Sequence, residues 1–172
     1  LSLRTGGTLT QTGAFVVANH ADIHAANATL NQANNFNTLS LNGGSIEVTD
    51  INDVSLSTSL LTGTSVLNLG GGLTQTGSIT AAHLDVSAAG HNVVLDNAGN
   101  SLGSLSLIAE QATVVDSDGL ILAQNTIGQS LNLTAGGDIT QTYALAVTDL
   151  TLNAAGRLIT LDNSNNDFDN LS

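Results

Sequence analysis

The sequence predicts an all-β protein whose chain winds as a parallel β-solenoid, and three observations lead to that prediction. A phrase rich in glycine, threonine and glutamine occurs three times, as GGTLTQT at 6–12, GGLTQT at 71–76 and GGDITQT at 136–142. Short runs of alternating apolar and polar residues recur between the phrases, and this alternation is the period of a strand with one buried face. Only 2% of the residues are aromatic, which favours a slim interior without large rings.

The three phrases mark a long and steady repeat. Their glutamines, Gln11, Gln75 and Gln141, lie about 65 residues apart. Self-similarity at a fixed period is typical of solenoids, in which each unit buries its apolar side against the next. We therefore expect one continuous solenoid segment that consists of repeat units 1–66, 67–130 and a partial unit 131–172.

The expected strands are short and recur about every six to ten residues. Clusters of Gly, Asn, Asp and Ser separate them, and the motif LDN at 95–97 and 161–163 predicts two of the corners. Three strands with their corners take about 20 to 22 residues, so we expect about eight coils, about three per repeat unit, in a rod roughly 40 Å long. In chain order the strands are expected at 1–3, 46–48, 54–56, 67–69, 84–86, 104–107, 120–122, 131–133 and 150–152.

Stacking explains the unusual composition. Strands of adjacent coils lie about 4.8 Å apart, so Leu, Val and Ile stack on one another whereas a large ring strains the coil above. Proline removes a donor from the hydrogen-bond ladder, and its absence fits a chain of central strands. Disorder is disfavoured because 41% of the residues are hydrophobic and the mean hydropathy is +0.21.

Two stretches resemble the repetitive stalk of large bacterial adhesins of the filamentous haemagglutinin type. They are LTAGGDITQT at 133–142 and LTLNAAGRLITLDNSNNDF at 150–168. The resemblance covers the whole chain as a style of repeat. It implies a right-handed parallel β-helix, secretion by a two-partner system and a location on the bacterial cell surface.

The charge balance excludes several classes of partner. Fourteen acidic residues face only Arg4 and Arg157, which gives a net charge of −12. A polyanion cannot displace counterions from phosphates, so we expect no nucleic-acid binding and no attraction to anionic membrane surfaces. No apolar run is long enough for a membrane helix, so we expect no membrane insertion. We find neither cysteine nor a signal-peptide pattern, and we expect the chain to be an excerpt of a longer one.

The threonines of the TQT phrases raise the possibility of an ice-binding surface. Such a surface needs the motif on most consecutive coils, whereas here it returns once per repeat. We expect instead a polar corner or an exposed strand, in which the glutamine stacks or bonds the backbone across a turn.

Oxygen-rich loops at 162–170 and 116–119 raise the possibility of calcium binding. The spacing of Asp162, Ser164 and Asn166 lacks the later glutamate and the turn glycine of an EF-hand loop. The nonapeptides of calcium-loaded β-rolls are absent as well. We expect turn chemistry at these residues, and the sequence leaves weak calcium binding at 162–170 open.

The four histidines do not predict a metal site. Aligning the repeat units places His91 opposite Arg157, and His24 opposite Ser87 and Asn153. A ligand position would not exchange with such residues. We expect His20, His24, His83 and His91 to face solvent, and we expect no metal and no cofactor.

Paired carboxylates raise the possibility of a carbohydrate-active β-helix enzyme. Asp50 with Asp53, and Asp116 with Asp118, have the residue types for general acid and base catalysis. They recur with the repeat, however, whereas an active site is built once. We therefore expect no catalytic residues and keep such an enzyme as a remote alternative.

These observations favour a structural role without chemistry of its own. We expect a stalk or rod segment of a large exported adhesin, located outside the cell or at its surface. Its expected partners are further copies of its own repeat, and a host or cell-surface receptor that binds other regions. The alternative is a subunit of a self-assembling extracellular filament, joined end to end by strand pairing.

Overall fold

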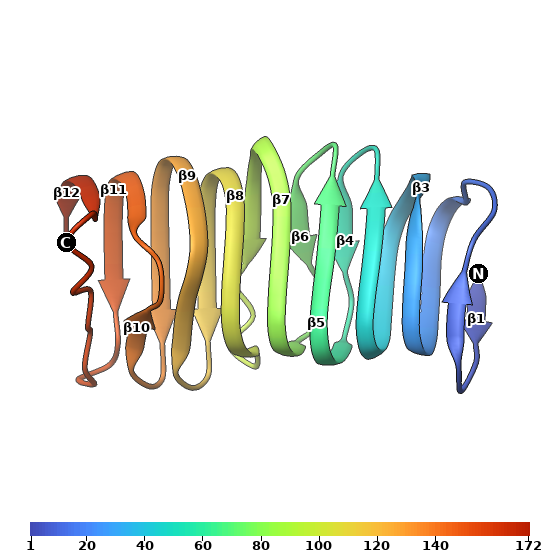
Figure 1. Ribbon diagram of the computed structural model, residues 1–172, viewed down its shortest axis with the longest axis horizontal. Coiled ribbons are helices and arrows are strands. Elements are labelled where there is room, and N and C mark those ends of the chain that lie inside the picture. Colours follow the sequence, from blue (N-terminus) through green and yellow to red (C-terminus); the bar gives the residue numbers. More distant parts are fainter.

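The computed structural model describes all 172 residues and contains twelve β-strands and no helix (Figure 1). No helix is therefore available that could cross a membrane. The strands are β1 (Ser2–Arg4), β2 (Thr8–Thr10), β3 (Val16–Asp50), β4 (Val54–Leu56), β5 (Ser59–Leu69), β6 (Leu73–Gln75), β7 (Ile79–Leu95), β8 (Ser101–Asp116), β9 (Leu120–Ala135), β10 (Ile139–Gln141), β11 (Leu145–Asn153) and β12 (Asp167–Leu171).

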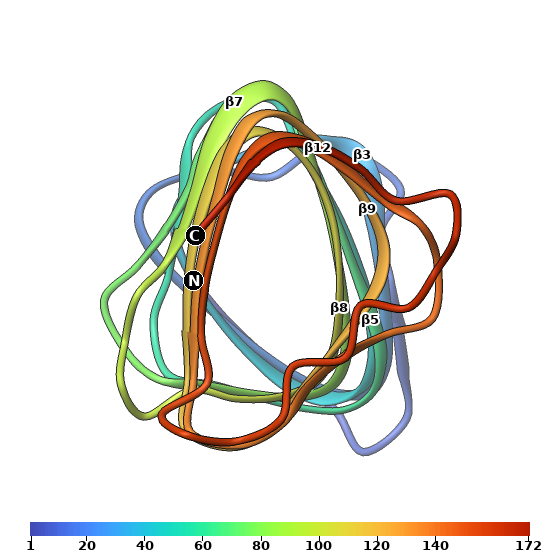
Figure 2. The same cartoon turned by 90° about the vertical axis from the view of Figure 1, so that its left-hand side faces the viewer.

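The chain winds around one axis, and every strand pairs in parallel with the coil before or after it. Figure 2 looks along this axis with the C-terminal coil towards the viewer, and β12 passes over the top from right to left. This direction is anticlockwise for a chain that approaches the viewer, so the solenoid is right-handed. The predicted fold class is confirmed.

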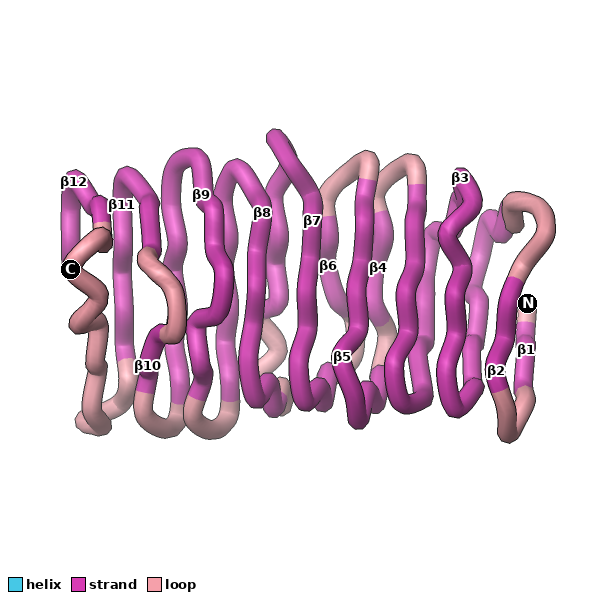
Figure 3. The backbone as a smooth tube through the Cα atoms, in the orientation of Figure 1, coloured by secondary structure: helices cyan, strands magenta, loops and turns pink.

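The coils are shorter than expected. Val93 pairs with Ala112 and Ala112 pairs with Leu131, so the chain returns to the same place after about 19 residues. About nine coils result, in place of about eight coils of 20 to 22. The difference arises at the corners, because β3 bends around almost two coils as one 35-residue strand and so needs few separate turn residues (Figure 3).

Each repeat unit spans about three and a half coils rather than three. Because a coil takes about 19 residues, the repeat ends about half a turn away from its start. Strand pairing shows the offset directly. Val54 pairs with Leu73, which pairs in turn with Val93. Leu120 lies one repeat after Val54, but it belongs to a different row of stacked residues and pairs with Ile139. In Figure 3, β2 and β10 accordingly lie on the near side and β6 on the far side. Equivalent motifs of successive repeats therefore face opposite sides of the rod.

The core is one continuous stack of 40 buried apolar residues. Residues of the same type stack on one another in successive coils. Leu84 pairs with Leu105, which pairs with Leu122, and all three side chains are fully or almost fully buried. The one fully buried ring is Phe36, which packs against Phe15 with ring centroids 6.3 Å apart. The predicted stacking of aliphatic side chains is therefore observed.

In the second and third copies of the repeated phrase, glycines lie where one coil touches the coil before it, whereas Gly6 and Gly7 of the first copy have no such contact. A Cβ atom on Gly136 would lie 2.2 Å from the carbonyl oxygen of Ser117, and one on Gly71 would lie 2.4 Å from the backbone nitrogen of Asp53. No side chain fits at these distances. The second and third copies of the phrase therefore need glycine because their corners rest directly on the backbone of an aspartate-rich corner.

Candidate functional site

Gln75 and Asn100 tie two neighbouring coils together through their side-chain amides. Gln75 ends β6, and Asn100 closes the turn before β8. The Nε2 atom of Gln75 donates to Asn100 Oδ1 at 2.9 Å, and Asn100 Nδ2 donates back to Gln75 Oε1 at 3.0 Å. Gln75 Nε2 also donates to the carbonyl oxygen of Gly77 at 2.7 Å. We call this reciprocal pair of side chains an amide clamp.

The asparagine of the clamp is completely buried and bonds three successive coils. Asn100 Oδ1 accepts the Ile79 backbone N–H at 2.9 Å from the preceding coil. Asn100 Nδ2 donates to the carbonyl oxygens of Leu95, in its own coil, at 3.1 Å and of Val115, in the following coil, at 3.0 Å. A buried amide with all of these partners satisfies backbone groups that the irregular corner would otherwise leave unpaired.

The clamp occurs once in each repeat. Gln11 and Asn34 exchange bonds of 2.8 and 3.0 Å, and Gln141 and Asn166 exchange two bonds of 2.8 Å. Asn34 is also fully buried. In all three clamps the glutamine Nε2 donates at 2.7 Å to a carbonyl oxygen two residues further on, that of Gly13, Gly77 or Tyr143.

A buried aspartate extends the clamp into the next coil. Asp116 is only 2% exposed, and its Oδ1 accepts the backbone N–H groups of Leu102 and Ser117 at 3.0 Å each. Asp50 lies at the equivalent position one repeat earlier, is equally buried, and its Oδ2 accepts the Phe36 N–H at 2.7 Å. Each of the two clamps that lie within the first two repeats therefore has a glutamine, an asparagine and an aspartate on three successive coils.

Burial raises the pKa of both aspartates. For Asp50, the backbone N–H groups that its carboxylate accepts partly oppose the rise. For Asp116, burial raises the pKa to about 7, and the nearby Asp118 carboxylate adds to the rise while the N–H groups of Leu102 and Ser117 oppose it. Desolvation is the main cause in both cases, because a buried carboxylate loses its hydration.

The paired carboxylates of the sequence separate into one buried and one exposed residue. Asp50 and Asp116 are the buried acceptors, whereas Asp53 and Asp118 lie on the surface. The exposed aspartates also accept hydrogen bonds from neighbouring coils. Asp53 Oδ1 accepts the backbone N–H of Gly72 at 2.7 Å, and Asp118 Oδ2 accepts the Ser101 hydroxyl at 3.0 Å. Both pairs thus bind the next or the previous coil.

Polar residues of the 162–170 segment make turn and inter-coil bonds. Asn163 Oδ1 accepts the backbone N–H of Asn165 at 3.0 Å, Asn166 belongs to the third clamp, and Asn170 Nδ2 donates to Asp149 Oδ1 at 2.7 Å. Nowhere in the structure do three His, Cys, Asp or Glu side chains converge as a metal-binding group.

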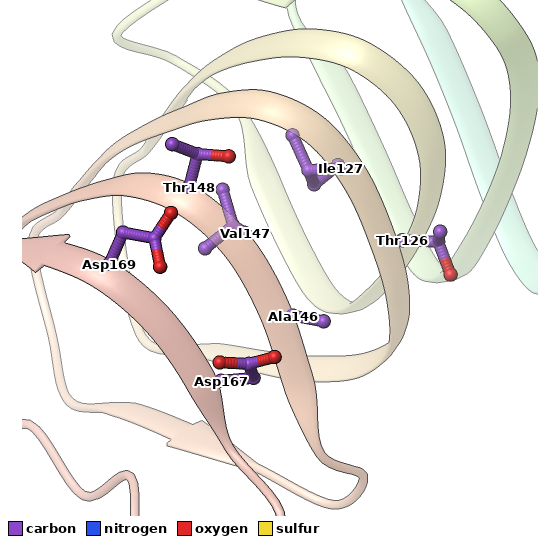
Figure 4. A pocket seen from close by; sticks show the side chains of 7 residues that line it. All are labelled: Thr126, Ile127, Ala146, Val147, Thr148, Asp167 and Asp169. Atoms are coloured by element: carbon purple, nitrogen blue, oxygen red, sulfur yellow. The ribbon is translucent and has the colours of Figure 1, made fainter.

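A shallow hollow of about 210 Å³ lies on the outer surface near the end of this segment (Figure 4). Asp167 and Asp169 alternate along β12 and lie beside residues 146–148 of β11, which include Val147 and Thr148. The remaining lining residues, Thr126 and Ile127, come from β9. The lining has two carboxylates and no basic side chain.

Three histidines lie on the surface and one is half-buried. His83 on β7 lies between Ser104 of the adjacent strand β8, whose hydroxyl contacts its Nδ1, and Asp85, whose Oδ1 is 2.9 Å from its Nε2. The three side chains form a small polar cluster on the outer side of the sheet. The exposed histidines are His20, His24 and His91.

Sequence reasoning found the glutamines of the clamp but not their partners. Each TQT glutamine was expected to stack or to bond the backbone across a turn, and the three bonds to Gly13, Gly77 and Tyr143 show the second of these alternatives. The asparagines were missed, although Asn34, Asn100 and Asn166 recur at an exactly constant interval. That constancy was the available signal, since the glutamines themselves are spaced less regularly.

The fold and its recurring clamps define the chain as a β-solenoid repeat protein. The chain belongs to the family DUF5649, described as repeats of unknown function, whose model matches it at residues 1–42, 43–109 and 109–172. These segments divide the repeat at different points from the units 1–66, 67–130 and 131–172. The comparisons with curated proteins and with solved structures gave no match.

Proposed function

We propose that the chain is a structural rod segment of a large exported bacterial surface adhesin. The observation that carries the proposal is the recurrence of one clamp in every repeat on an unbroken parallel ladder. The glutamine and asparagine that recur in every repeat form hydrogen bonds between neighbouring coils. The repeated motif therefore holds adjacent coils together. The resemblance of the GGDITQT phrase and its surroundings to adhesin stalks supports the exported location and a two-partner route.

The architecture suits a spacer because its length is adjustable. Each coil contacts only its neighbours, so stability is close to a sum of coil and interface terms and repeats can be added without redesign of the core. Strand pairing supplies most of the 101 backbone hydrogen bonds, which connect successive coils along the axis. Such a rod would hold more variable binding modules, and the receptors that they bind, away from the cell.

The surface charge supports a role as an isolated rod. Fourteen acidic residues and two arginines leave a net charge of −12 on a segment of 172 residues. Like charges on neighbouring rods repel one another, which keeps them soluble and limits lateral association. Further copies of the repeat are therefore proposed as partners within the same chain.

Electron microscopy combined with sedimentation tests the rod against the filament alternative. The purified 172-residue segment is expected to form short discrete rods whose sedimentation does not change with concentration. Fibres that lengthen with concentration would contradict the spacer and favour end-to-end assembly. Immunogold labelling of cells that produce the full-length protein tests the location. Label outside the cell envelope is expected, and label confined to the cytoplasm would contradict an exported adhesin.

A further inference from the structure

Two buried side-chain oxygens in the whole chain have no hydrogen-bond partner, and both lie at the aspartate corner. They are Asn52 Oδ1 and Asp116 Oδ2. Asn34 and Asn100 occupy equivalent positions in successive repeats. By the same spacing, Asp50 corresponds to Asp116 and Asn52 corresponds to Asp118. The same corner is thus unsatisfied in both repeats, but only in the second repeat is the residue two positions after the buried aspartate a carboxylate; in the first repeat it is Asn52, and the second acid, Asp53, comes one residue later.

We propose that Asp116 and Asp118 share one proton, which makes this corner the pH-sensitive junction of the rod. The proton is bound to Asp116 Oδ2, which then donates a hydrogen bond to the Asp118 carboxylate. On release the proton passes to solvent and leaves two negative charges side by side. The shared proton therefore supplies the missing partner of Asp116 Oδ2 and removes the repulsion between the two groups.

The contacts of the two carboxyl groups agree with this arrangement. Both N–H bonds to Asp116 go to Oδ1, from Leu102 and Ser117, so Oδ2 is free to hold the proton. Asp118 is exposed, and its Oδ2 accepts the Ser101 hydroxyl at 3.0 Å. Asp118 is thus in contact with water, whereas Asp116, at 2% exposure, is the group that burial neutralises.

The coils on either side of this corner supply no compensating positive charge. The preceding coil carries Asp96, which is exposed, and the following coil carries Asp138, whose Oδ1 accepts the Leu158 backbone N–H at 3.1 Å. Arg157 belongs to the coil beyond Asp138, and the causes that shift the pKa of Asp116 include no basic group. Asp118 is accordingly the one charged side chain that acts on Asp116.

The equivalent corner of the first repeat shows what one carboxylate does alone. Asp50 uses both oxygens as acceptors, Oδ2 for the Phe36 N–H at 2.7 Å and Oδ1 for the Asn52 N–H at 3.1 Å. Its side chain therefore has no oxygen left without a partner. The first repeat therefore forms a built-in comparison, because Asn52 stands in place of Asp118 and the other acid of the corner, Asp53, accepts the Gly72 N–H of the next coil.

Carboxyl ¹³C NMR titration of the intact 172-residue chain tests the proposal. In the wild type, the Asp116 carboxyl is expected to titrate near pH 7, and the Asp50 carboxyl is expected to titrate above its ordinary value of 3.8. Asp118→Asn is expected to move the Asp116 midpoint towards the ordinary value of 3.8, because the like charge is gone. Asn52→Asp is expected to move the Asp50 midpoint upwards, because it creates the same pair in the first repeat.

Three outcomes would overturn the proposal. The first is a wild-type Asp116 that titrates near the ordinary value of 3.8, which requires no variant to fold. The second is an Asp116 midpoint that Asp118→Asn leaves unchanged, because burial alone would then explain the shift. The third is loss of the titration in millimolar calcium chloride, because a cation rather than a proton would then hold the two carboxylates together.

Discussion

Gln75 and Asn100, 25 residues apart in the sequence, exchange two hydrogen bonds of 2.9 and 3.0 Å across the boundary between two coils. The same exchange joins Gln11 to Asn34 and Gln141 to Asn166. Because each repeat covers about three and a half coils, these clamps alternate between opposite sides of the rod. The same motif therefore holds adjacent coils together on both sides of the rod.

Replacement of the buried asparagine is expected to destabilise the solenoid strongly. Asn100→Ala leaves the Ile79 N–H and the carbonyl oxygens of Leu95 and Val115 without their side-chain partner. Buried polar groups without partners cost about 1 to 3 kcal/mol each before relaxation, so we expect a loss of about 3 kcal/mol in the free energy of unfolding. Urea unfolding followed by circular dichroism measures the change.

The matched control for this variant is an exposed asparagine in the same coil. Asn92 faces solvent on β7, and Asn92→Ala is expected to change the free energy of unfolding by less than about 0.5 kcal/mol. Equal effects of the two substitutions would show that the clamp contributes nothing specific.

The two halves of a clamp are expected to act as one unit. Gln75→Ala and Asn100→Ala remove the same reciprocal bonds, so the double variant should lose less stability than the two single losses added together. A coupling energy of about 1 to 2 kcal/mol is expected from a double-mutant cycle in urea. Strict additivity would contradict a direct exchange of hydrogen bonds.

A methyl group at the glycine corner is expected to force two coils apart. Gly136→Ala places a Cβ atom 2.2 Å from the Ser117 carbonyl oxygen, and that oxygen belongs to the backbone and cannot swing away. We expect a loss of about 1 to 3 kcal/mol, as in other overpacked interiors. Gly6→Ala is the control, because its Cβ atom would meet nothing within 4 Å. Thermal unfolding measures the stability of both variants, and the midpoint of Gly136→Ala is expected to be the lower one. Equal midpoints would contradict the close contact at Gly136.

Stability is expected to fall as the pH rises through neutrality. The pKa of Asp116 is raised from 3.8 to about 7 in the folded chain, so the folded state holds its proton more tightly than the unfolded state. The stabilisation is therefore complete below pH 3.8 and is lost as the pH rises through about 7. The raised pKa of Asp50 acts in the same direction.

Asp116→Asn isolates this contribution from the general effect of the net charge. The amide keeps an acceptor for the Leu102 N–H and supplies a permanent donor towards Asp118. The difference in unfolding temperature between wild type and variant should change between about pH 4 and about pH 8. Two curves that stay parallel over that range would rule out a contribution from Asp116.

The sequence was sufficient to predict the solenoid because its signals are local and repeated. Alternation in runs such as 84–86 and 104–107 predicts strands, and these runs lie in β7 and β8. The corner at 95–97 also lies where the LDN motif placed it, directly after Leu95 ends β7. Each of these signals depends on a few residues that are close together in the sequence, and none depends on contacts with the next coil.

The clamp partners could not be predicted because they depend on the length of a coil. Asn100 meets Gln75 only if the chain returns after about 19 residues, whereas the strand and corner pattern favoured longer coils. The long strand β3 bends around almost two coils, yet its 35 residues contain one glycine pair, Gly43 and Gly44, and no proline, so its bends are only sparsely marked in the sequence. The half-turn offset between repeats follows from the same coil length and was missed for the same reason.

Small-angle X-ray scattering of the purified segment measures whether slim coils stack along one axis into a rod. A stacked solenoid is expected to give a pair-distance distribution with an early maximum at the width of one coil and a long, nearly linear decline to the full length. A symmetric, bell-shaped distribution would show a globule with a broad interior and would contradict the stacked solenoid.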